Sequence, residues 1–166
     1  LVGFCFDIPP LDGEAGIQLS VDSTEKIVKN LGNHPNFPKI GNKYIFFSFS
    51  GAWRHSPEKI AEIKRRLKAK GIEIYYVLHR ETAEWRSNVE KMVEGTYIDP
   101  YGEVCDSFYP FMFSSRAWND RGEPEGVHRK EFVALRNALA RFNKKPVATI
   151  TPGYRGNWLE DLGHYG

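Results

Sequence analysis

Residues 44–78 read YIFFSFSGAWRHSPEKIAEIKRRLKAKGIEIYYVL, and this stretch decides the fold. The run 44–49 is apolar apart from Ser48, which is typical of a buried strand. Ser56 followed by Pro57 predicts the start of a helix, whose end is predicted at Gly71. A second apolar run, 72–78, predicts another strand. A strand–helix–strand unit predicts two parallel strands in one sheet.

The same alternation continues outward along the chain. Apolar runs at 1–8, 104–113 and 147–151 predict three more strands, so the sheet is expected to have five. A helix is predicted to open near Asp22, after a Gly- and Pro-rich loop, because Asp22 and Glu25 resemble a capping box. Two further helices are predicted from the apolar spacing of Trp85, Val89 and Met92 and of Phe132, Leu135, Leu139 and Phe142.

Five strands in strict alternation with four helices predict an α/β fold with a parallel sheet. Two architectures fit: an incomplete (β/α)₈ barrel of about five βα units, or an open doubly wound sheet. The loops that follow strands are long and carry polar and aromatic residues, which favours the barrel. The Gly-rich phosphate loops expected of a nucleotide-binding open sheet, G-x-G-x-x-G or G-x-x-x-x-G-K, do not occur in the sequence.

The length of 166 residues fits a single domain covering 1–166. A net charge of +2, spread along the chain, argues against a nucleic-acid partner, and the apolar runs are too short to predict a membrane partner. The two cysteines, Cys5 and Cys105, cannot build a disulfide framework, and a Cys/His metal spacing is missing. We therefore expect neither a metal nor an organic cofactor.

The predicted strand ends collect flat aromatic rings together with carboxylate, hydroxyl and imidazole groups. Sugars suit that mixture, because their C–H faces stack on aromatic rings and their hydroxyls need hydrogen-bonding partners. Asp7 could instead cap a loop, and His79 could be a structural histidine. The candidates at the strand ends are Asp7, Ser50, Trp53, His79, Tyr109, Trp118, Tyr154 and Trp158.

Several segments resemble known families. The stretch 33–43, NHPNFPKIGNK, leads into a strand that ends Ser48-Phe49-Ser50-Gly51. With the segments 4–7 (FCFD), 104–108 (VCDSF), 145–146 (KP), 151–154 (TPGY) and 157–158 (NW), it resembles glycoside hydrolase family 71, the α-1,3-glucanases, and family 99, the endo-α-mannosidases and mannanases. The resemblance covers most of the chain in order.

The resemblance implies a (β/α)₈ barrel acting on an α-linked polysaccharide or oligosaccharide. It implies that the catalytic carboxylates follow Gly166, so that this chain is the central part of a larger barrel and needs the remainder of that barrel or a partner chain. Secretion is implied only by analogy with these families. The substrate-lining positions that it implies are Asp7, Ser50, Trp53, Asp106, Tyr109, Tyr154 and Trp158.

The sequence therefore predicts a glycoside hydrolase-like protein that acts on or binds an α-1,3-glucan or α-mannan type of glycan. Two alternatives stay open. One is a carbohydrate-binding module that breaks no bond. The other is a complete, flavodoxin-like open-sheet domain that binds a small ligand.

Overall fold

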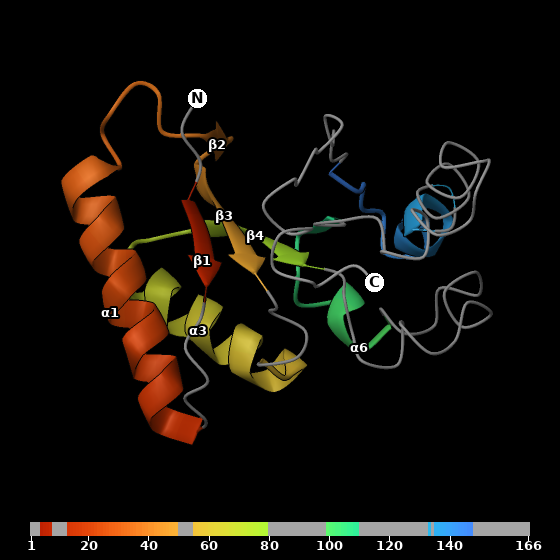
Figure 1. The fold of residues 1–166 in the computed structure, drawn as a ribbon, viewed down its shortest axis with the longest axis horizontal. Coiled ribbons are helices and arrows are strands. Elements are labelled where there is room, and N and C mark those ends of the chain that lie inside the picture. The colour runs from red at the N-terminus through yellow and green to blue at the C-terminus, as the bar shows by residue number, and fades with distance from the viewer. Residues whose placement is uncertain are drawn as a thin grey trace, which may run out of the picture.

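The described part of the chain is an α/β unit in which a helix lies between each pair of consecutive parallel strands (Figure 1). This confirms the α/β class, with which both the barrel and the open sheet are compatible. Its elements are β1 (Phe4–Asp7), α1 (Gly13–Leu31), β2 (Lys39–Ile40), β3 (Lys43–Phe49), α3 (Pro57–Ala69), β4 (Ile74–His79), α6 (Asp99–Gly102) and β5 (Ser107–Tyr109). The computed structural model describes residues 4–7, 13–49, 55–79, 99–109, 133 and 135–147, with the backbone alone for 4–7 and 49.

Four strands lie side by side in the order β1-β3-β4-β5, and each neighbouring pair is parallel. These four strands therefore follow one another across the sheet in the same order as in the sequence. The short strand β2, which the sequence pattern does not predict, pairs antiparallel with the start of β3 and makes the sheet mixed. The two-residue turn Gly41-Asn42 joins β2 to β3, and Gly41 has a φ of 58°, a conformation that glycine adopts without strain.

Helix α3 begins where the sequence predicts. The Ser56 side chain accepts a hydrogen bond from the Lys59 N–H at 3.3 Å, and Pro57 occupies the first helical position. This satisfies one of the free N–H groups of the first turn, and the missing N–H of proline costs nothing there. The predicted apolar stripe is confirmed, because its members are buried: Ile60, Ile63 and Leu67.

Gly71 ends α3, also as predicted. The Gly71 N–H bonds to the Lys68 carbonyl at 2.9 Å and the Ile72 N–H to the Leu67 carbonyl at 3.0 Å, the pattern of a Schellman cap. Gly71 has a φ of 76°, and nothing lies within 4 Å of the place where a Cβ would stand. Backbone conformation alone therefore selects glycine here.

We expect Gly71→Ala to lower the free energy of unfolding by about 1 kcal/mol, because an L-residue with a Cβ is strained at positive φ. Gly71→Asn is the matched variant and should cost less, because Asn tolerates this conformation better. Urea unfolding of the two variants and the wild type measures both effects. Equal costs for Ala and Asn would contradict the conformational explanation.

Helix α1 begins at Gly13, nine positions before the predicted start at Asp22. The Gly- and Pro-rich composition of the segment before Asp22 favours a loop, but the helix includes this segment from Gly13 onward, and Gly16 is buried in it. Asp22 does not cap a helix. It lies mid-helix and accepts a hydrogen bond from Gln18 Nε2 at 2.8 Å.

Helices α1 and α3 lie next to one another beside the strands (Figure 1). Arg66 of α3 pairs with Glu14 of α1, and Lys70, just after α3, pairs with Glu25 of α1 at 2.7 Å. Both helices contribute to one continuous core with alternate residues of the strands. The strand residues of that core are Phe46, Ile74, Tyr76, Leu78 and Phe108, and the helical ones include Val21, Ile60, Ile63, Leu67, Leu135 and Leu139.

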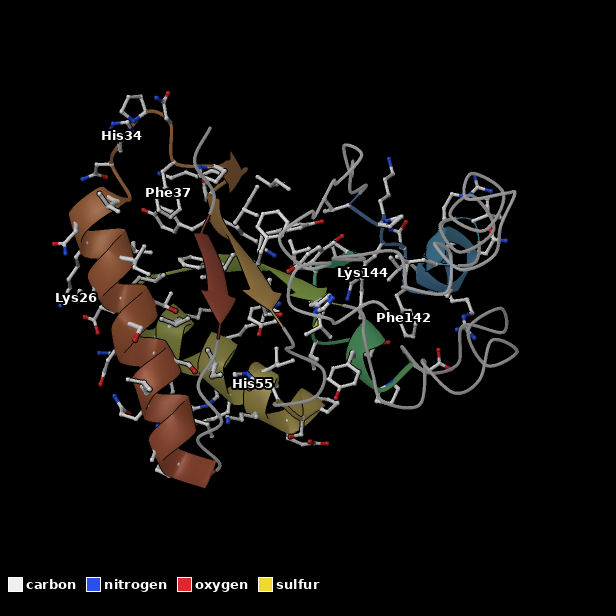
Figure 2. All side chains as sticks on the ribbon, viewed as in Figure 1. Lys26, His34, Phe37, His55, Phe142 and Lys144 are labelled. Atoms are coloured by element: carbon white, nitrogen blue, oxygen red, sulfur yellow. The ribbon has the colours of Figure 1, made fainter. Side chains whose placement is uncertain are left out.

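The segment 135–147 packs beside α6. Lys144 Nζ donates to the Gly102 carbonyl, and the Phe142 ring covers Gly102 closely enough that a Cβ there would meet it at 2.4 Å (Figure 2). Leu135 and Leu139 are buried, as the helical spacing predicted. The helix predicted around Trp85 lies outside the described residues, as do residues 148–151 of the fifth predicted strand.

The strand predicted over 104–113 is shorter in the structure. β5 begins at Ser107, so Val104, Cys105 and Asp106 precede it, and residues 110–113 lie outside the described part. Cys105 is a free, buried thiol, and burial raises its pKa to about 12. This thiol is therefore unreactive at neutral pH.

Candidate functional site

The register of the sheet aligns the carboxyl ends of its parallel strands. Asp7 pairs with Phe49, and His79 pairs with Tyr109. Ser48 pairs with Leu78, so the next residues along β3 and β4, Phe49 and His79, stand at the same level. Ligands of parallel α/β folds bind at this edge. Two of the predicted site residues, His79 and Tyr109, are therefore neighbours there, and the backbone of Asp7 lies at the same level.

Three rings cluster on the sheet face that points away from the core described above. The Tyr109 ring stands edge-on to Phe47, with centroids 5.4 Å apart and planes at 88°. On its other side the His79 ring lies 5.3 Å away, tilted by 33°. Edge-to-face packing of this kind stabilises aromatic pairs beyond their buried area. Phe47 is not among the residues that the sequence predicts for the site, and only the strand register shows that it shares a face with His79.

Hydrogen bonds fix the positions of these residues. The Tyr109 hydroxyl reaches across to β3 and donates to the Ser48 carbonyl at 3.2 Å. The Ser48 hydroxyl donates to the Val77 carbonyl at 3.5 Å and accepts from the His79 N–H at 3.4 Å. A buried serine thus ties the last residues of β3 and β4 together, and tyrosine ties β5 to β3.

His79 and Tyr109 are almost fully covered, with exposed fractions of 1% and 6%. Together with Phe47 they form a covered layer of rings at this end of the sheet, which we call the aromatic floor, rather than an open surface. A ligand at this edge would rest above them, on the residues that follow the strands. The candidates that follow the strands, Ser50, Trp53, Trp118, Tyr154 and Trp158, lie outside the described residues, as does the side chain of Asp7.

Asp106 lies at the other end of the sheet, just before the start of β5. Its carboxylate accepts hydrogen bonds from Lys64 Nζ at 2.6 Å, from Lys43 Nζ at 3.2 Å and from the Tyr76 N–H at 2.9 Å. The structure therefore does not bring Asp106 together with His79 and Tyr109. Its partners come from β3, α3 and β4, so Asp106 joins the helix layer to the sheet.

The environment of Asp106 keeps its carboxylate ionised. Burial raises the pKa of Asp106, but the Lys64 hydrogen bond, the Tyr76 N–H and the Lys43 charge outweigh burial and hold the pKa below its ordinary value of 3.8. Lys64 also donates to the Val104 carbonyl at 2.8 Å. A carboxylate paired in this way is suited to holding the amino ends of the strands in place.

The described residues contain no group of three or more His, Cys, Asp or Glu side chains placed to hold a metal ion. Within the same ranges, no helix combines the length and the apolar character needed to cross a bilayer.

Comparisons with known proteins found no family model, no curated protein and no solved structure that matches this chain.

Proposed function

We propose that this chain is an arc of a (β/α)₈-type barrel and that the carboxyl ends of its strands bind an α-linked glycan. The observation that carries the proposal is the chain-order arrangement of the parallel strands, with His79 and Tyr109 side by side at their carboxyl ends.

The order of the strands supports the proposal that the sheet is part of a barrel. A doubly wound sheet reverses its strand order at the point where ligands bind, and β1-β3-β4-β5 runs without a reversal. The order extends further, because the Val147 N–H donates to the Phe108 carbonyl of β5 at 2.9 Å. Residue 147 thus begins to pair at the outer edge of β5, where the next strand of a barrel belongs.

The position of the hydrophobic core also supports the proposal that the sheet is part of a barrel. Right-handed crossovers that all advance in one direction place their helices on one side of the sheet. The other face must then be covered in a different way, and in a barrel the sheet curls so that this face closes on itself. Phe47, Val77 and Tyr109 lie on that face, and Val77 and Tyr109 are buried although they are not part of the helix-side core.

The chemistry at the strand ends favours a carbohydrate. Phe47, His79 and Tyr109 provide a rigid aromatic floor, and the aromatic residues predicted to follow the strands would stack on sugar rings above it. The resemblance to families 71 and 99 points to α-1,3-glucan or α-mannan. Hydrolysis would need two facing carboxylates, and Asp7 is the single carboxylate residue at the described strand ends. Following the resemblance, we propose that this chain binds the glycan and that the catalytic carboxylates lie outside residues 1–166.

Binding is tested by titration calorimetry with α-1,3-gluco-oligosaccharides and α-manno-oligosaccharides. We expect one of the two series to bind, and His79→Ala to weaken that binding about tenfold because the floor beside Tyr109 is lost. His34→Ala is the matched control, since His34 lies exposed in the loop after α1 and should bind like the wild type.

A reducing-sugar assay on the two polysaccharides separates binding from hydrolysis. We expect no sugar to be released. Release by this chain would contradict the proposal that its catalytic carboxylates lie elsewhere, and the lack of binding by a folded sample would contradict the glycan proposal itself.

A further inference from the structure

A small cavity lies between the sheet and the helices, on the side opposite to the aromatic floor. It measures about 20 Å³, which is room for one water molecule. Part of its wall is apolar and comes from β3, β4 and α3. The remaining wall is polar and is made of Ser20 and Thr24 of α1, Tyr76 of β4 and His55, which is labelled in Figure 2 and comes just before α3.

Tyr76 has an unusual place in this wall. Its side chain is 5% exposed, and among the described residues no group meets its hydroxyl with hydrogen-bond geometry. Ser48 lies near the phenol, but its hydroxyl is directed to the backbone of β4, at Val77 and His79. A buried hydroxyl without a partner is costly, so native structures normally satisfy such a group with protein or with ordered water.

The facing wall of α1 carries hydroxyls where a helix normally places apolar side chains. Ser20 and Thr24 stand one turn apart on the side of α1 that also buries Val21. The Ser20 hydroxyl donates to the Gly16 carbonyl at 2.8 Å, which leaves its oxygen able to accept a hydrogen bond. Thr24 is 5% exposed, so its hydroxyl is also removed from bulk solvent.

We propose that this cavity is a binding site for a single structural water, which joins the Tyr76 hydroxyl to the hydroxyls of Ser20 and Thr24. The volume suits one water, and the polar wall offers the two to four partners that a buried water requires. The bridge connects α1 to β4 through the interior, independently of the glycan proposal and at a different place in the fold.

The test uses Tyr76→Phe and Thr24→Val in the full chain, since each removes one hydroxyl with little change of shape. We expect each variant to lower the thermal midpoint by about 2–4 °C, because the water loses a partner. Tyr75→Phe is the matched control. Tyr75 is half-buried and alternates to the other face of β4, so its variant should keep the wild-type midpoint.

Nuclear Overhauser cross-peaks from water to the Tyr76 ring or the Thr24 methyl group supply the second measurement. A long-lived water should give these cross-peaks in the wild type, and both variants should weaken them. A wild-type protein without the cross-peaks overturns the proposal. So does a higher midpoint for Tyr76→Phe, which is the result expected when a hydroxyl is removed from a dry cavity.

Discussion

We expect Asp106→Asn to lower the free energy of unfolding by about 2–3 kcal/mol, because it removes the negative charge between two lysines. Lys64 and Lys43 point at this carboxylate from α3 and β3, and both would keep their charge in the variant. The amide can still accept from the Tyr76 N–H, so the loss is mainly electrostatic. Lys43 is 41% exposed, and water therefore compensates part of that loss.

The same interaction makes stability depend on pH. The pKa of Asp106 is lower in the folded protein than its ordinary value of 3.8, so the unfolded chain takes up the proton first as the pH falls. The stability that Asp106 contributes is therefore present above pH 3.8. It is lost as the pH falls through the lower pKa of the folded state. Urea unfolding of wild type and Asp106→Asn should show a difference that is constant above this range and shrinks below it.

Asp99→Asn is the control for the charge effect. Asp99 pairs with Arg141 at 2.6 Å, but both side chains are nearly half exposed, so this variant should cost less than about 1 kcal/mol. An Asp106→Asn variant as stable as Asp99→Asn would contradict the linking role that we give to Asp106.

The elements that sequence reasoning placed well are those with strong local chemistry. Ser56, Pro57 and Gly71 mark both ends of α3, because capping depends on residues only a few positions apart. The start of α1 was misplaced because Asp22 and Glu25 imitate a capping box. In the structure Glu25 instead pairs with Lys29 and Lys70, and the latter partner is 45 positions away.

The candidate site was predicted where the end of an apolar run marks the end of a strand. His79 and Tyr109 were found in this way, and the register places them side by side. Phe47 was missed because its contact with Tyr109 depends on that register, which local patterns do not contain. The position of Asp106 could not be predicted either. The apolar run at 104–113 predicts a strand that contains Asp106, whereas β5 starts only at Ser107.

Phe46 and Phe47 are neighbours in β3 that face opposite sides of the sheet, and their alanine variants should behave differently. Phe46 is 1% exposed and lies in the helix-side core, tilted against the Phe37 ring at 6.1 Å. We expect Phe46→Ala to lower the free energy of unfolding by about 3–5 kcal/mol, because it loses buried area and leaves a cavity. Its effect on glycan affinity should be small at temperatures where the variant is folded.

Phe47→Ala should show the reverse pattern. Phe47 is half-buried, so we expect a loss of about 1–2 kcal/mol in the free energy of unfolding. Its ring holds Tyr109 in place at the strand ends, and its removal should weaken glycan binding about tenfold. Urea unfolding and calorimetric titration of the two variants separate the faces, because stability reports on the helix side and affinity on the aromatic floor. Equal losses of stability in the two variants would contradict the assignment of these residues to opposite faces. A Phe47→Ala variant with wild-type affinity would leave that assignment intact and contradict the floor as part of the glycan site.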